Sequence, residues 1–143
     1  MGYTHYWQRS PQLPHDAFGR AVADCQRALP PTHVPLAGAN GNGQPRFKSD
    51  AIVFNGVGID AHETFAIRLS EPERSDGRPA FLFCKTEHKP YDLAVQVALI
   101  VFKHHLGEAF HVSSDGAEAD WDTARELCQH HLGYGADFQL DKG

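Results

Sequence analysis

The chain of 143 residues is long enough for one domain whose hydrophobic core needs no metal or disulfide. Its content of 41% hydrophobic and 22% charged residues is typical of a folded globular chain, which excludes a disordered protein and a membrane protein. The formal net charge is -5 and the basic residues are scattered, so duplex nucleic acid is excluded as a partner.

The cellular compartment can be predicted from the N-terminal residues and the cysteines. The first residues lack the basic segment and apolar run of a secretion signal, and no apolar stretch reaches the length of a membrane span. The three cysteines Cys25, Cys84 and Cys128 are an odd number and form no zinc or CxxC pattern. We therefore expect a cytoplasmic protein with reduced thiols.

The first predicted elements are a strand and a helix. Residues 3–8 are dense in aromatic side chains that alternate between two faces, which predicts a strand. Residues 16–29 carry apolar side chains at helical spacing and precede two prolines, which predicts a helix and its end. Residues 32–49 are rich in Gly, Pro and Asn and predict only loops and turns.

Three strands are predicted between this loop region and the next helix. Residues 51–54 are apolar, residues 62–69 alternate apolar and polar side chains, and we expect these two segments to pair. Residues 79–85 contain an unbroken apolar run, which predicts a strand buried on both faces. Such a strand would be central in the sheet.

The rest of the chain predicts helix, strand and helix. Pro90 and Asp92 suit a first helical turn, and the following residues are apolar on nearly all sides, so this helix should be buried. Residues 110–114 predict a strand and residues 121–132 an amphipathic helix. The order β-α-β-β-β-α-β-α predicts a single α+β domain over residues 1–143, with a mixed or antiparallel sheet covered by helices and a largely buried central helix.

The strongest pattern for a binding site lies where the apolar strand meets the buried helix. Lys85, Thr86 and Lys89 stand close to the helix start, whose free N–H groups and partial positive charge suit an anion. We expect an anionic, nucleotide-like small molecule at residues 84–92. The alternative is that these residues only cap the helix and are solvated.

Three residues are candidates for catalysis, which would make the protein a hydrolase. Cys84, near a helix start and two lysines, would have a favoured thiolate, although a free cysteine in a strand is usually a buried apolar side chain. His62 or Glu63 can act as acid or base, but only one of them faces a pocket because alternation points them to opposite faces. Asn55 shares their turn and is a candidate ligand contact.

Two more segments can contribute to such a site. Tyr3 and His5 in the first strand can stack a planar ligand or simply pack in the core. Ser114 and Asp115 end the last predicted strand, and they would lie level with residues 84–86 if those two strands were parallel neighbours joined by the buried helix. The remaining candidate ligand contacts are Tyr91 and Asp92.

Two other functions stay open at the level of the sequence. One is a protein–protein interaction module without catalysis, which would use Tyr6, Trp7 and residues 32–49. The other is a small metal-dependent hydrolase, although no complete metal motif is present. Its candidate ligands are His5, His62 and Asp115. The sequence indicates no particular cofactor and no oligomeric state.

Four signatures are spaced along the chain: YTHYW, FNG with HETF, FCKT with KPYD, and SSDG with DW. They resemble a family of small single-domain bacterial and phage-type proteins. The resemblance spans almost the whole chain and implies one domain whose signature residues are the polar turns and strand ends described above. It implies no particular activity.

Overall fold

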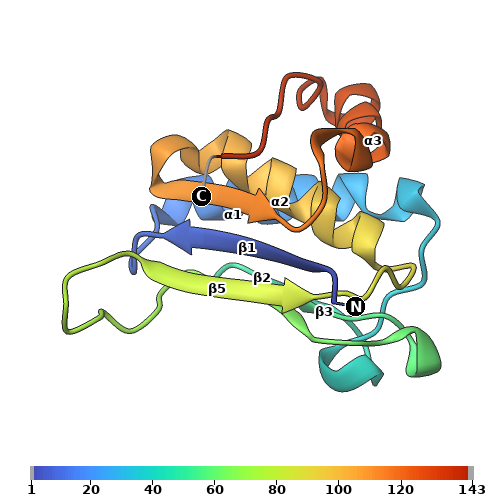
Figure 1. The fold of residues 1–143 in the computed structure, drawn as a ribbon, viewed down its shortest axis with the longest axis horizontal. Coiled ribbons are helices and arrows are strands. Elements are labelled where there is room, and N and C mark those ends of the chain that lie inside the picture. The colour runs from blue at the N-terminus through green and yellow to red at the C-terminus, as the bar shows by residue number, and fades with distance from the viewer. Residues whose placement is uncertain (1, 142–143) are drawn as a thin grey trace.

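The structure is a computed structural model that describes residues 2–141, and these form one α+β domain with three helices and two antiparallel sheets (Figure 1). The first sheet has the order β5 (Ala80–Lys85), β1 (Thr4–Arg9), β6 (Phe110–Ser114). The second has the order β2 (Arg46–Lys48), β3 (Ala51–Phe54), β4 (Phe65–Arg68). The helices are α1 (His15–Ala28), α2 (Asp92–Leu106) and α3 (Asp122–Leu132).

The connection from β5 through α2 to β6 determines where the site lies. Both strands pair antiparallel with β1, so they run parallel to each other with β1 between them. The prediction that they are direct neighbours is therefore wrong. Their C-terminal ends nevertheless lie at the same edge of the sheet, on either side of the N-terminal end of β1 (Figure 1).

The prediction that β5 is central and buried on both faces is also wrong. The central strand is β1, and β5 alternates between a buried face with Cys84 and an open face on which Phe81 and Phe83 are 47% and 55% exposed. The helices lie on one side of this sheet (Figure 1). An unbroken apolar run does not reveal this alternation, because both faces of the strand carry apolar side chains.

The second sheet confirms the predicted pairing and adds a strand that the sequence did not predict. The strands β3 and β4 pair as expected, with Ile52 opposite Ile67. Residues 32–49 are not only loop, because they contain β2, in which Phe47 lies opposite Ile52. A strand of three residues among glycines and prolines is too short to give a periodic signal.

The buried helix is confirmed. Every residue of α2 from Ala94 to Phe102 is buried, and the helix ends where Gly107 takes a positive φ of 57°. Burial of each large apolar side chain here contributes about 1.5–3 kcal/mol to stability. Trp7 is 1% exposed and belongs to the same core, so it cannot contact a partner protein as the interaction hypothesis requires. No helix within residues 2–141 has the length and apolar character needed to cross a membrane.

Candidate functional site

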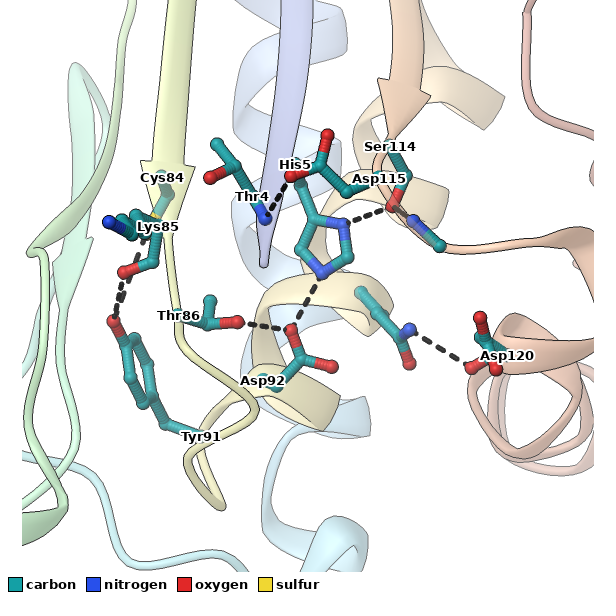
Figure 2. A network of polar contacts seen from close by, with 12 residues as sticks. Thr4, His5, Cys84, Lys85, Thr86, Tyr91, Asp92, Ser114, Asp115 and Asp120 are labelled. Atoms are coloured by element: carbon teal, nitrogen blue, oxygen red, sulfur yellow. Dashed lines mark hydrogen bonds and ion pairs between the residues drawn. The ribbon is translucent and has the colours of Figure 1, made fainter. Parts of the chain in front are cut away.

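The side chain of His5 is the centre of a polar cluster at the edge where the three strands of the first sheet meet α2 (Figure 2). His5 is 0% exposed. Its Nδ1 lies 2.8 Å from the hydroxyl oxygen of Ser114, and its Nε2 lies 2.7 Å from Oδ1 of Asp92. The hydroxyl of Thr86 donates to the same Asp92 oxygen at 2.5 Å. These contacts form one continuous chain of side chains.

The register of the sheet explains why these residues meet. His5 and Ser114 are opposite each other in the ladder between β1 and β6, and alternation turns both toward the helices. Thr86 directly follows β5 and is buried. Asp92 lies in the first turn of α2, where the helix dipole stabilises a carboxylate. Residues that are distant in sequence are thereby brought together.

The donor and the acceptor can be assigned in each of these side-chain hydrogen bonds. A carboxylate only accepts hydrogen bonds, so His5 donates from Nε2 to Asp92, and in the neutral imidazole Nδ1 then accepts. The hydroxyl of Ser114 therefore donates to His5. Its oxygen accepts the N–H of Gly116 at 2.9 Å. A hydroxyl bonded to a base that a carboxylate orients is the arrangement of an activated nucleophile.

Aromatic rings surround the imidazole. Tyr3 lies edge-on to His5 with ring centroids 5.1 Å apart, and Trp121 does the same at 5.0 Å. Burial, with the charges of Asp92 and Asp120, raises the pKa of Tyr3 to about 12, so its phenol stays protonated at neutral pH. Sequence reasoning assigned Trp121 only to a helix face, although its place in the DW signature was a usable signal.

Asp115 lies next to this cluster but does not join the chain of side chains. Its Oδ2 accepts the backbone N–H of Thr4 at 3.1 Å, and its Oδ1 accepts the hydroxyl of Tyr6 at 3.0 Å. Tyr6 is partly buried and lies opposite Phe83, on the open face of the sheet. Asp115 therefore fixes the end of β6 against β1.

The three residues predicted to hold an anion do not converge. Lys85 pairs with Glu87 at 3.4 Å, and its side chain points away from His5 (Figure 2). The ammonium of Lys89 donates to the carbonyl of Ile59 at 3.3 Å. The third residue, Thr86, donates to a carboxylate. The anionic ligand stays a prediction, and a neutral ligand suits the surroundings of His5 better because Asp92 carries a negative charge there.

The residues around the other predicted acid and base form a second cluster that mainly fixes the backbone. Asn55 is buried; its amide donates to the carbonyl of His62 at 3.0 Å, and its Oδ1 accepts the N–H of His62 at 3.0 Å. Glu63 accepts the N–H of Lys85 at 2.7 Å, and Tyr91 donates to the carbonyl of Glu63 at 2.6 Å. The imidazole of His62 belongs to an exposed residue.

Cys84 lies inside this second cluster. Its Sγ donates to the carbonyl of Glu63 at 3.4 Å and lies 4.0 Å from the hydroxyl of Tyr91. Burial, with the nearby charges of Glu63 and Asp92, raises the pKa of the Cys84 thiol to about 12. The thiol is therefore protonated at neutral pH, which favours its interpretation as a buried apolar side chain.

Among residues 2–141, no group of three or more His, Cys, Asp or Glu side chains lies close enough together to hold a metal ion. Comparison of the chain with protein-family models, curated proteins and solved structures found nothing similar.

Proposed function

We propose that the protein is a hydrolase of small molecules that contain an ester-like or amide-like carbonyl group. Ser114 is the nucleophile, His5 the general base, and Asp92 the group that orients the imidazole. The observation that carries the proposal is the chain of hydrogen bonds in which His5 lies 2.8 Å from the Ser114 hydroxyl and 2.7 Å from the Asp92 carboxylate.

The reaction would proceed in two steps. The Ser114 oxygen attacks the carbonyl carbon while His5 takes its proton at Nδ1, and the bond to the leaving group breaks as His5 returns the proton to that group. Water then attacks the acyl group on Ser114, again losing its proton to His5. The acid product leaves and the Ser114 hydroxyl is restored. The Asp92 carboxylate stabilises the imidazolium form of His5 in both steps.

The surroundings support this assignment in two ways. The His5–Asp92 contact is shielded, since His5 is fully buried and Asp92 is 16% exposed in its side chain, and electrostatic contacts are stronger in such a place than in water. Ser114 is only partly buried whereas His5 is fully buried, so in this proposal the substrate reaches the site from the side of Ser114. The three free cysteines are consistent with a cytoplasmic location, which we include in the proposal.

A fluorophosphonate probe tests the proposal, because it forms a covalent bond with activated serine hydroxyls. We expect one probe per chain by intact mass, on Ser114, and no label on the Ser114→Ala variant. The matched control is Ser113→Ala, since Ser113 is the neighbouring serine but lies opposite Tyr6 on the open face. Folded wild-type protein that stays unlabelled, or a Ser114→Ala variant that labels like the wild type, would refute the assignment.

A further inference from the structure

The face of the first sheet that lies away from the helices carries an aromatic patch made of Tyr6, Phe81 and Phe83. The rings of Tyr6 and Phe81 are stacked, with centroids 5.9 Å apart, and those of Phe81 and Phe83 are 6.4 Å apart. Phe81 and Phe83 are among the few large apolar side chains that are exposed in the described chain. A patch of this kind on a monomer is typical of an interaction surface.

The backbone of β5 at this patch is also available for pairing. In the ladder with β1, the N–H of Thr86 bonds the carbonyl of Tyr3, so the hydrogen-bonding groups of Lys85 point away from β1. They bond to Glu63 instead. By alternation along the strand, Phe81 and Phe83 also present their N–H and C=O groups to this outer edge, where no strand within residues 2–141 pairs with β5.

An unprotected edge strand invites another strand to pair with it. Native proteins usually block such edges with a charge, a proline or a bulge. Here Pro79 precedes β5 and Lys85 ends it, but residues 80–84 between them read AFLFC and contain neither a charge nor a proline. We propose that β5 pairs antiparallel with β5 of a second copy of this chain, around a two-fold axis at Leu82. The two first sheets would then form one continuous sheet of six strands.

A second copy fits this edge because the strand is complementary to itself. With the axis at Leu82, Phe81 of each copy forms a hydrogen-bonded pair with Phe83 of the other, which gives four backbone hydrogen bonds and sets the four phenyl rings side by side. An axis at Phe83 would instead require the groups of Lys85 that Glu63 already occupies.

The charges that flank the strand support the same register. Arg78 lies just before β5 with its side chain 76% exposed, and Glu87 lies just after it. An axis at Leu82 places Thr86 of one copy opposite Arg78 of the other. Each Glu87 carboxylate, which pairs with Lys85 of its own chain at 3.4 Å, would then lie between that ammonium and the Arg78 guanidinium of the other copy. Charge complementarity therefore exists at both ends of the paired strands.

The oligomeric state in solution tests this proposal. We expect sedimentation equilibrium to give twice the chain mass for the wild-type protein and the mass of one chain for Phe83→Lys, because the new charge would be buried in the phenyl cluster. The control is His111→Lys, which adds a charge to the exposed end of the same face on β6 and should stay dimeric. A wild-type monomer at hundreds-of-micromolar concentration, or a dimer that survives Phe83→Lys, would overturn the proposal.

Cysteine crosslinking tests the register and the identity of the occupant. At the two-fold axis the residues at position 82 face each other as a non-hydrogen-bonded pair, with Cα atoms about 4.5 Å apart, which a disulfide can bridge. We expect Leu82→Cys to form a disulfide dimer under mild oxidation and Phe83→Cys to form none, while the buried native cysteines stay free. Crosslinking of Phe83→Cys in place of Leu82→Cys would contradict the axis at Leu82. Co-purification of a different protein bound to β5 would contradict the proposal that the partner is a second copy of this chain.

Discussion

Within residues 2–141, two histidine–aspartate pairs lie largely shielded from solvent, and only one of them has the geometry of a reactive site. His5 lies 2.7 Å from Asp92 at the strand ends, and His105 lies 2.8 Å from Asp24 between α2 and α1. A hydroxyl completes each group, Ser114 in the first and Tyr134 in the second. The two groups therefore contain the same three kinds of functional group.

The position of the hydroxyl separates the two groups. Ser114 bonds the ring nitrogen opposite the one that faces Asp92, so a proton can pass from the hydroxyl to the imidazole. Tyr134 donates at 2.6 Å to the same Asp24 oxygen that His105 contacts, and it lies 3.4 Å from the same nitrogen. This second group is a closed triangle that ties α1, α2 and the C-terminal segment together. A histidine–aspartate pair alone is thus no indication of catalysis.

Thiol alkylation gives the largest expected effect. Cys84 lies near the first group and Cys128 near the second, and burial raises the pKa of each thiol to about 12. At pH 8 the thiolate fraction is then about 10⁻⁴, so reaction with iodoacetamide should be at least about 1,000-fold slower in the native protein than after unfolding. If Cys84 alone reacted fast in the native protein, Cys84 would be a better candidate nucleophile than Ser114, and the contrast between the His5 and His105 groups would no longer identify the reactive site.

The Asp92→Asn substitution should have the next largest effect. The amide keeps the size of the carboxylate but can donate to His5, which removes the preference for a free acceptor at Nδ1. We expect the rate of fluorophosphonate labelling of Ser114 to fall on the order of 100-fold. Asp24→Asn is the matched control and should leave this rate unchanged, so equal losses in both variants would indicate general unfolding.

The Tyr134→Phe substitution should have the smallest effect, on stability alone. Burial by itself raises the pKa of Asp24, but the hydrogen bonds from Tyr134 and His105 outweigh it, so the pKa lies below its ordinary value of 3.8. The carboxylate therefore stabilises the fold above the unfolded-state pKa, and this contribution is lost as the pH falls through the folded-state pKa. The variant should lose about 1 kcal/mol in urea unfolding at pH 7 and less at pH 3. An equal loss at both pH values would contradict this role of Asp24.

Much of the fold could be predicted because its elements carry strong periodic signals. The buried helix and the strand Phe110–Ser114 were predicted with nearly the observed bounds. The strand order could not be predicted, because a local apolar pattern does not report which strand lies beside which. As a result, β1 was not recognised as central and β5 was not recognised as an edge.

The members of the site were partly predictable, but their connections were not. The sequence predicts His5, Thr86, Asp92 and Ser114 as ligand contacts because they lie in the aromatic first strand, at strand ends or at the start of the buried helix. That His5 bridges Ser114 and Asp92 could not be predicted, since the contact depends on β1 lying between β5 and β6. Lys85 and Lys89 predicted an anion site, but in the fold Lys85 pairs with Glu87 and Lys89 donates to the carbonyl of Ile59.

The most direct test of the central claim compares fluorophosphonate labelling of Ser114 in His5→Gln and His105→Gln, with circular dichroism to verify that both variants fold. The account predicts that the labelling rate falls on the order of 100-fold or more in His5→Gln, because glutamine cannot accept the hydroxyl proton as a base, and stays within about twofold of wild type in His105→Gln. Equal rates in the two folded variants would contradict the account.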